Sequence, residues 1–179
     1  VLSVFAGLRP LAAPRSEGKK TKEISRSHKL IREKSGLITI IGGKWTTYRK
    51  MAQDTLDLAI RYMHIPTKDC ITERYQIHGS RKNPDFSDPL YVYGTDADEI
   101  RNLVASSPAM AEKLHPDYAY TVGEVTWLVR NEMPRTLEDV LARRLRILFL
   151  DARAAMAMAP KVAGILATEW GKDETWTSA

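Results

Sequence analysis

The chain has 179 residues, of which 44% are hydrophobic, and a formal net charge of +5. That length allows one domain or one and a half, and the apolar content is ordinary for a globular protein. The longest purely apolar run is far shorter than the roughly 20 residues of a membrane-spanning helix, and no signal-peptide pattern is present. The single cysteine, Cys70, excludes an internal disulfide and fits a reducing compartment.

Positive charge is concentrated in the first third of the chain. Residues 1–61 carry 13 Lys and Arg against 5 Asp and Glu, whereas residues 62–179 carry 14 against 17. A basic field favours anionic partners. We predict no nucleic-acid partner, because the aromatic residues do not interleave with the basic run and no nucleic-acid motif is present. The run at residues 19–22 is expected to be a solvated basic face.

The first elements in chain order are predicted strands. The chain does not begin with Met, so we expect a piece of a longer protein. Residues 1–7 are predicted to form a buried strand, and residues 12–23 a basic surface loop. Residues 24–33 and 36–41 are predicted strands, joined by a hairpin-like turn.

Helices follow the strands. Apolar residues at helical spacing predict a helix over 46–63, closed by Pro66. Residues 65–94 are rich in Pro and Gly and are predicted to be an irregular linker. Capping boxes are expected at Thr95 and Thr136, and residues 175–179 are expected to be frayed. The later predicted helices are 95–106, 108–114, 121–132, 137–145, 146–158 and one from Pro160 to about 171.

Residues 35–49, SGLITIIGGKWTTYR, place a strand, two glycines and a helix start in succession. The first N–H groups of a helix have no helical acceptor, and the helix dipole favours negative charge there. Glycines let a ligand approach the backbone closely. Lys44, Thr46 and Thr47 add a cation and two hydroxyl groups at the same place. The segment therefore predicts a site for a phosphorylated or otherwise anionic ligand.

These glycines also allow other interpretations. Gly42-Gly43 can be simply a tight connection between a strand and a helix. The nucleotide P-loop pattern fails, because Ile38 stands five residues before Gly43 and Trp45 follows Lys44. No G-x-G-x-x-G fingerprint occurs in the chain. A nucleotide site would therefore need residues from elsewhere.

Three segments together resemble the FAD-dependent (aerobic type) glycerol-3-phosphate dehydrogenases. They are FAGLRPL at residues 5–11, ISRSH at 24–28 and IIGGKWTTYR at 40–49. Residues 124–144 resemble the C-terminal helical domain of the same enzymes. The GGKWTTYR string is quite specific, whereas many flavin amine oxidases carry strings similar to GLRP.

The resemblance implies an α+β fold in three parts. Residues 1–64 would be an incomplete C-terminal piece of an FAD-binding sheet domain, 65–94 a linker, and 95–179 an all-α C-terminal domain. The family's N-terminal flavin fingerprint and much of its substrate lid are absent from this chain. Three strands and one helix are also too few to bury a sheet on both faces.

Site residues are carried over from the family position by position. Arg9 would be catalytic and would steady the substrate oxygen and phosphate, and Arg26 would be a second phosphate ligand. Guanidinium groups match phosphate bidentately and stay charged. Alternatively, Arg9 is a surface arginine and Arg26 a solvated strand residue.

The glycine turn would approach the flavin ring. The residues expected to contact FAD are Gly42, Gly43, Lys44, Thr46 and Thr47. Lys44 would lie near the flavin carbonyl edge or the substrate, where positive charge stabilises the anionic reduced flavin. Because half of the flavin site is missing, residues 1–179 alone are expected to bind FAD weakly or not at all and to be inactive.

The parent enzyme would oxidise sn-glycerol 3-phosphate to dihydroxyacetone phosphate and pass electrons to a membrane quinone. Such enzymes lie peripherally on the inner, cytoplasmic face of the cell membrane. Two alternatives stay open: a glycerophosphate oxidase that uses oxygen, and a non-catalytic helical interaction module. The oligomeric state also stays open, with a homo-oligomer among the alternatives.

Several other residues are expected to be structural. No His, Cys, Asp and Glu set has metal-ligand spacing, so no metal site is predicted. Trp127 and residues 152–159 are expected to pack in a core. His28 is expected to be structural, and Tyr48 and Arg49 to pack and pair. Salt bridges to Glu138, Asp139 and Asp151 are favoured over contact with another subunit, an anionic lipid or a phosphate for three basic residues: Arg143, Arg144 and Arg146.

Overall fold

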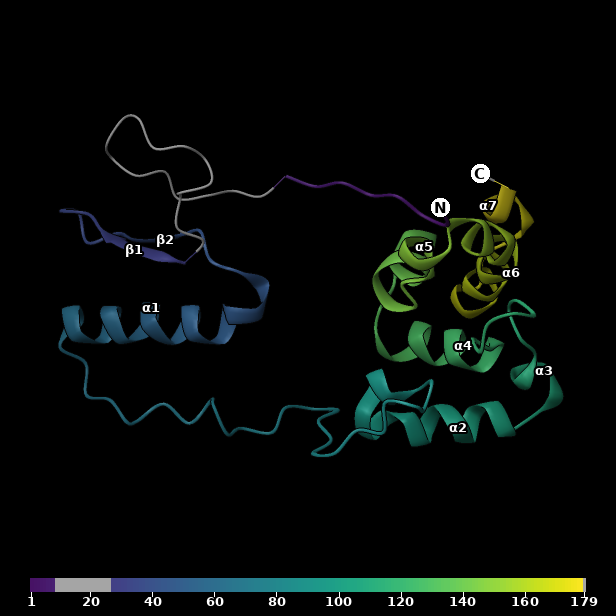
Figure 1. Cartoon of the computed structure of the whole chain (residues 1–179), viewed down its shortest axis with the longest axis horizontal. Coiled ribbons are helices and arrows are strands. Elements are labelled where there is room, and N and C mark those ends of the chain that lie inside the picture. The colour runs from purple at the N-terminus through teal and green to yellow at the C-terminus, as the bar shows by residue number, and fades with distance from the viewer. Residues whose placement is uncertain (9–26, 179) are drawn as a thin grey trace. The chain divides into compact units, whose positions relative to one another are not determined.

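The computed structural model describes residues 1–8 and 27–178 and divides into two compact units (Figure 1). One unit comprises Val1–Ala6 with Ile77–Ala179, and the other comprises Gly7–Gln76. Arg9, Arg26 and the predicted loop at 12–23 lie outside the described residues. The domain bounds 1–64, 65–94 and 95–179 stay a prediction. No helix among the described residues is long and apolar enough to cross a membrane.

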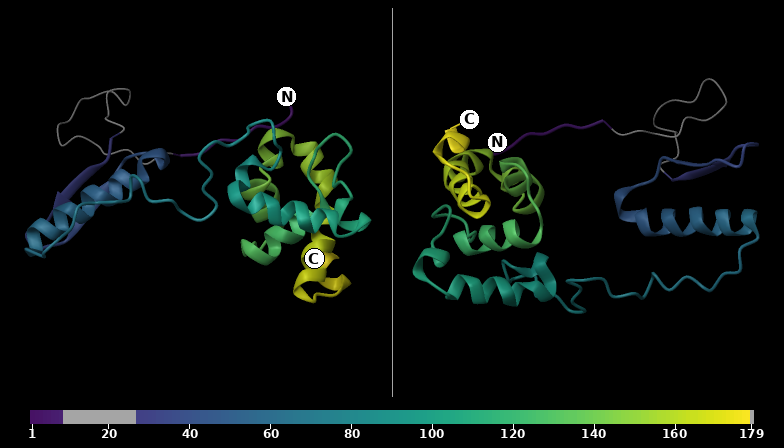
Figure 2. Two further views of the ribbon diagram at one scale, coloured as in Figure 1. Left: turned by 90° about the horizontal axis from the view of Figure 1, so that it is seen from below. Right: turned by 180° about the vertical axis from the view of Figure 1, so that it is seen from behind.

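The smaller unit contains an antiparallel hairpin of β1 (Lys29–Arg32) and β2 (Ile38–Ile41). The predicted turn between them is confirmed, and Gly36, with φ of +92°, donates its N–H to the Glu33 carbonyl at 3.0 Å. Both strands are shorter than predicted in the part of the chain that the structure describes. The unit also contains one α-helix, Tyr48–Met63, which lies along the hairpin in both Figure 1 and Figure 2.

That helix, α1 (Tyr48–Met63), follows a 3-10 turn at Trp45–Thr47. It ends at His64, which adopts a left-handed conformation and donates its N–H to the Ile60 carbonyl. The predicted helix over 46–63 is therefore confirmed apart from its tighter first turn. The end comes two residues before Pro66, where a proline disfavours helical geometry in the residue that precedes it.

The prediction of a buried strand at residues 1–7 is wrong. Among the described residues the sheet contains only β1 and β2, and Val1, Val4 and Phe5 are exposed. The segment is extended and lies against the helical unit, where the Leu2 carbonyl accepts the Ala152 N–H at 3.1 Å. The Leu2 carbonyl is thus paired with the start of α6 in place of a neighbouring strand.

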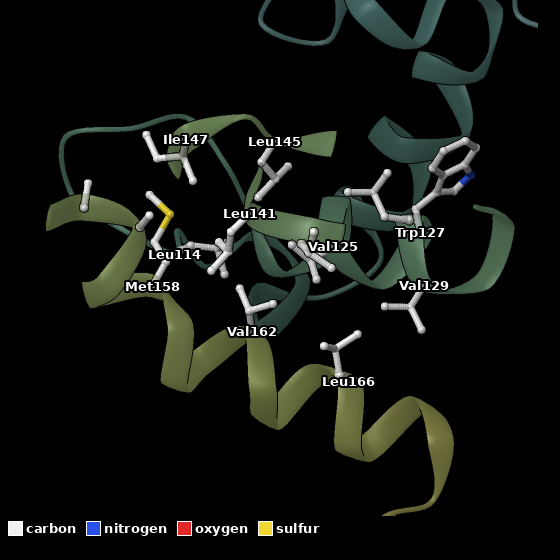
Figure 3. Packing of buried hydrophobic residues seen from close by; sticks show 14 of the residues in the cluster. Leu114, Val125, Trp127, Val129, Leu141, Leu145, Ile147, Met158, Val162 and Leu166 are labelled. Carbon is white, nitrogen blue, oxygen red and sulfur yellow. The ribbon is translucent and has the colours of Figure 1, made fainter. Parts of the chain in front are cut away.

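The larger unit is helical after residue 95, as predicted, so the chain has the α+β character expected. One cluster of buried side chains joins its helices, as Figure 3 shows for α4 and α6 residues such as Val125 and Leu166. Trp127 belongs to this cluster, and the predicted packing role of the 152–159 stretch is confirmed for Ala154, Ala155 and Met158 but not for Met156, which is 73% exposed. The elements are α2 (Ala97–Ala105), α3 (Pro108–Ala111), α4 (Val122–Asn131), a π-helical segment (Asp139–Arg144), α5 (Ile147–Leu150), α6 (Ala152–Trp170) and α7 (Glu174–Ser178).

One of the two predicted capping boxes forms. The Asp139 N–H donates to Thr136 Oγ1 at 3.1 Å, and the Thr136 N–H donates to Asp139 Oδ2 at 3.1 Å. The box at Thr95 is wrong, because Asp96 is the N-cap of α2 and makes no side-chain cap bond. The Asp96 carboxylate instead lies 2.8 Å from His78 Nε2.

The predicted break before Pro160 is also wrong, because α6 runs through it. Asp151 starts the helix by accepting the N–H groups of Arg153 and Ala154. Pro160 cannot donate to the carbonyl of Met156, but both residues are exposed, so water can solvate that carbonyl. Gly171 ends the helix in a left-handed conformation, as expected.

The C-terminal tail is helical as far as Ser178, not frayed as predicted for 175–179, and Ala179 lies outside the described residues. Asp173 Oδ1 accepts the N–H of Trp176 at 3.2 Å. The Trp176 ring packs edge-on against Trp170 with the ring centroids 5.5 Å apart, an arrangement that aromatic pairs favour. An aromatic contact with α6 therefore orders a segment whose local sequence is polar.

Two of the three arginines form ion pairs, as favoured from the sequence, but with partly different partners; the pair predicted for Arg146 does not form among the described residues. Arg143 pairs with Glu138 at 2.8 Å and with Asp139 at 3.0 Å. Arg144 instead pairs with Glu132 at 3.1 Å. The Arg144–Glu132 pair joins the π-helical segment to the residue that ends α4.

Candidate functional site

The glycine turn joins β2 to the start of α1. Gly42 has φ of +74° and Gly43 has φ of +88°, a region that L residues other than glycine rarely adopt. A Cβ on Gly43 would lie 2.5 Å from the Met51 sulfur and 3.3 Å from His28 Cβ. The backbone conformation therefore favours glycine at position 43, and any larger residue would also displace the end of the Met51 side chain.

An open hollow of about 740 Å³ lies at this turn. Two aromatic rings beside it are strongly exposed: Trp45 at 88% and Tyr48 at 58%, with their centroids 5.8 Å apart. The hollow thus places apolar ring surface next to glycine backbone and a helix start. Its lining residues are Gly42, Gly43, Lys44, Trp45, Thr46, Tyr48 and Met51.

The polar residues of the turn divide into two kinds. Thr47 Oγ1 accepts the Lys44 N–H at 3.3 Å and donates to the Lys44 carbonyl at 3.0 Å, so its hydroxyl closes the turn. Within residues 1–8 and 27–178, the Lys44 ammonium and the Thr46 hydroxyl have no hydrogen-bond or ion-pair partner. Both line the hollow and are available to a ligand.

The neighbouring charges on α1 are paired. Arg49 donates to Gln53 at 2.9 Å and to Thr72 at 3.0 Å, and pairs with Glu73 at 3.3 Å. This confirms the expectation that Arg49 is structural. Lys44 is thus the cation of this turn that the described residues leave free.

A second charge cluster lies one turn further along α1, at Asp54. Lys50 Nζ lies 2.9 Å from Asp54 Oδ1, and His28 Nε2 lies 2.9 Å from Asp54 Oδ2. The hydrogen bond from Lys50, followed by that from His28, holds the pKa of Asp54 below its ordinary range. The expected structural role of His28 is confirmed, because its ring ties the chain before β1 to α1.

The predicted ligand residues fall into three groups. Gly42, Gly43, Lys44 and Thr46 are brought together around the hollow, and Thr47 stands behind them as a turn-forming residue. Arg9 and Arg26 lie outside the described residues. The sequence analysis did not assign Trp45, Tyr48 and Met51 to the site. Trp45 could have been assigned, because it is a large aromatic residue directly after the glycines and does not belong to the apolar face predicted for the helix.

Comparison with known proteins gives a consistent result. Residues 37–177 match the family described as the C-terminal domain of alpha-glycerophosphate oxidase. The chain is 34% identical to a mitochondrial glycerol-3-phosphate dehydrogenase of Arabidopsis thaliana, over 96% of this chain and 32% of that protein. It is 35% identical to a probable mitochondrial glycerol-3-phosphate dehydrogenase of Caenorhabditis elegans, over 100% of this chain and 27% of that protein.

A mitochondrial glycerol-3-phosphate dehydrogenase of Homo sapiens is 30% identical, over 97% of this chain and 26% of that protein. The chain thus spans about a quarter to a third of the length of the curated relatives it matches. The resemblance found from the GGKWTTYR, GLRP and helical segments is confirmed by these matches.

Proposed function

We propose, because the chain belongs to the family of C-terminal domains of alpha-glycerophosphate oxidase, that it is the C-terminal portion of an FAD-dependent dehydrogenase of sn-glycerol 3-phosphate. The observation that carries the proposal is the glycine turn with its free lysine. The exposed glycine backbone, the first N–H groups of the helix and an ammonium group that is unpaired within the described residues lie together at this hollow. The relatives named glycerol-3-phosphate dehydrogenases support the choice of substrate.

The residues of the hollow fit a flavin. A planar, partly anionic ring system needs a flat apolar surface, backbone N–H donors and a cation. Trp45 offers the apolar surface, the Gly42-Gly43 backbone offers the donors, and Lys44 is the cation. When bound, FAD supplies the hydride acceptor at its N5 atom. In this proposal Lys44 places positive charge at the carbonyl edge of the ring or at the substrate, and Thr46 offers a hydroxyl. Thr47 keeps the turn closed around them.

Arg9 and Arg26 complete the proposed substrate site. Both positions are carried over from the family's GLRP-like and ITR-like strings, on which the family holds the substrate phosphate. Arg9 would steady the reacting oxygen and the phosphate, and Arg26 would make a second charge-assisted contact with the phosphate.

The sheet unit supports the proposal that a larger flavin domain surrounds it. No residue of β1, β2 or α1 is buried, although the strands contain Leu30, Ile31, Ile38 and Ile40. A two-stranded hairpin with one helix covers one sheet face and leaves the other without a layer. Residues 1–179 alone are accordingly expected to bind FAD weakly, and purification of a stoichiometrically yellow protein from them would contradict this.

The electron acceptor is proposed to be a membrane quinone, reached from a peripheral position on the inner face of the membrane. An oxidase would pass the electrons to oxygen instead. Hydrogen peroxide formed in proportion to glycerol 3-phosphate consumed by the full-length enzyme would assign the oxidase reaction.

The function is tested by substitution of Lys44 in the full-length enzyme. Lys44→Ala is expected to lower kcat/KM for glycerol 3-phosphate by about tenfold to a hundredfold, the effect of losing a charge-assisted contact of about 1.5–3 kcal/mol. Lys50→Ala is the matched control, because Lys50 pairs with Asp54 on the same helix. Equal effects of the two substitutions would contradict a role for Lys44 at the site.

A further inference from the structure

The helical unit contains a further pocket, bounded by α2, α3, α4 and the chain before Tyr91. The three helices contact one another and lie together in Figure 1. This α2–α4 pocket has a volume of about 390 Å³ and shares no lining residue with the hollow at the glycine turn. Its apolar walls include Leu90, Ile100, Val104, Ala105, Ala111 and Ala119.

One side chain that lines the pocket is a buried carboxylate. Glu124 lies in the first turn of α4 and is 4% exposed. The neutral Tyr93 hydroxyl donates to its Oε1 at 2.7 Å. No ion pair within residues 1–8 and 27–178 includes Glu124. Buried carboxylates are ordinarily paired with a cation or a metal, so this one lacks a positive partner.

The guanidinium group that lines the same pocket already has partners. Arg101 pairs with Asp88 and, at 2.5 Å, with Asp98. Asp88 also lines the pocket, so the charged groups there are two carboxylates and one guanidinium. An anionic ligand would meet this excess of negative charge, whereas a cation would supply the partner that Glu124 lacks.

The cation that suits the pocket is organic. No group of three or more His, Cys, Asp and Glu in the described part of the chain could hold a metal ion. Apolar walls with a few polar groups, in a volume of this order, are typical of small-molecule sites. A carboxylate has about four acceptor positions, so Glu124 can accept from a ligand while it keeps the hydrogen bond from Tyr93.

We propose that the α2–α4 pocket binds a small organic amine, whose ammonium group pairs with Glu124 and whose apolar body packs against Leu90, Ile100 and Val104. The ammonium group brings three donors and a full positive charge to the carboxylate. The apolar body removes wall surface from water. This site is independent of the proposed function, because it shares no residue with the glycine turn.

The ligand class is tested by isothermal titration calorimetry on the full-length enzyme. Phenethylamine is the probe, and it is expected to bind with a Kd below about 1 mM, in the range of a small ligand. Phenethyl alcohol has the same body without the charge, and hydrocinnamate carries the opposite charge. Both are expected to bind at least about tenfold more weakly, because neither offers an ammonium partner. Absence of phenethylamine binding would overturn the site, and equal binding of the alcohol would overturn the ammonium assignment.

The role of the carboxylate is tested by Glu124→Gln, which keeps the shape of the side chain and an acceptor for Tyr93. It is expected to weaken phenethylamine binding by about tenfold to a hundredfold, the effect of losing a charge-assisted contact. Glu138→Gln is the matched control, because it removes a carboxylate that pairs with Arg143 on the surface. Unchanged phenethylamine binding in Glu124→Gln would overturn the proposed contact.

The place of binding is tested by a second pair of variants that does not touch the buried carboxylate. Ala105 is an exposed wall residue near the end of α2, and Ala105→Leu is expected to weaken phenethylamine binding by about tenfold or more because the added side chain occupies the pocket. Ala52→Leu makes the same change at an exposed position of α1 and is expected to leave binding unchanged. Equal binding by these two variants would place the amine elsewhere and overturn the proposal.

Discussion

Tyr93 and Glu124 form a buried hydrogen-bonded pair within the helical unit. The Tyr93 hydroxyl donates to Glu124 Oε1 at 2.7 Å, and Glu124 is only 4% exposed. Burial raises the pKa of Glu124 above its ordinary value of 4.5, against the hydrogen bonds from Tyr93 and the Thr121 backbone. Burial also raises the pKa of Tyr93, with the Glu124 charge acting in the same direction.

Removal of the Tyr93 hydroxyl is predicted to destabilise the protein. Tyr93→Phe leaves a buried carboxylate oxygen with one fewer donor, which costs about 1–3 kcal/mol of unfolding free energy. Tyr91→Phe is the matched control, because Tyr91 is 43% exposed, and a surface change of this size stays within about 0.5 kcal/mol. Urea unfolding measures both, and equal midpoints for the two variants would contradict the role of the pair.

The pH dependence of stability is predicted to contain a contribution from Glu124. Its folded-state pKa is raised, so the folded protein holds this proton more tightly than the unfolded chain does. The contribution is therefore fully present below the ordinary pKa of 4.5 and is lost as pH rises through the raised folded value. Glu124→Gln removes the titration, and its unfolding free energy relative to the wild type should improve as pH rises above about 4.5. A difference between the two proteins that does not change with pH would contradict the raised pKa.

Gly43→Ala is predicted to abolish flavin retention by the full-length enzyme. The substitution forces an alanine to φ of +88° and places its Cβ 2.5 Å from the Met51 sulfur, so the backbone is strained and the end of the Met51 side chain, which lines the hollow, must move. Gly36→Ala is the control: its φ is +92°, but its Cβ would meet only the Tyr62 ring at 3.6 Å. It carries a similar backbone strain, about 1–2 kcal/mol, away from the hollow.

The ratio of flavin absorbance to protein absorbance after purification measures this effect. The account expects loss of flavin in Gly43→Ala, retention in Gly36→Ala, and partial recovery when Met51→Ala is added to Gly43→Ala. Full flavin content in Gly43→Ala would show that the turn does not hold the cofactor.

Arg26→Ala is predicted to raise KM for glycerol 3-phosphate in the full-length enzyme by about tenfold to a hundredfold, because a charge-assisted phosphate contact is lost. Arg32→Ala removes the same charge from β1, where the guanidinium lies 4.2 Å from the Tyr62 ring centre, and is expected to leave KM unchanged. Steady-state kinetics compares them, and an unchanged KM in Arg26→Ala would remove Arg26 from the site.

Local signals in the sequence predicted local structure well. The conformational freedom of Gly42 and Gly43 located the turn, and Thr136 and Gly171 marked a helix start and a helix end through backbone chemistry within four residues. These features depend on neighbours in sequence. The turn and the start of α1, where the anion site is proposed, could therefore be predicted from residues 35–49 by themselves.

Features that depend on distant partners could not be predicted in the same way. The Tyr93 partner of Glu124 lies in another element, so no spacing rule indicates the pair. Val1–Ala6 has a strand-like sequence, but the segment pairs with the α5–α6 corner, and only tertiary contacts decide between those outcomes. Pro160 is accepted inside α6 because that face is exposed, which the local pattern does not reveal.

Anaerobic mixing of the full-length enzyme with glycerol 3-phosphate tests the central claim most directly. The account predicts rapid bleaching of the visible flavin band, which Lys44→Ala slows or weakens and Lys50→Ala leaves unchanged. A flavin that stays oxidised at saturating glycerol 3-phosphate would contradict the proposed reaction and assign the site to a different substrate.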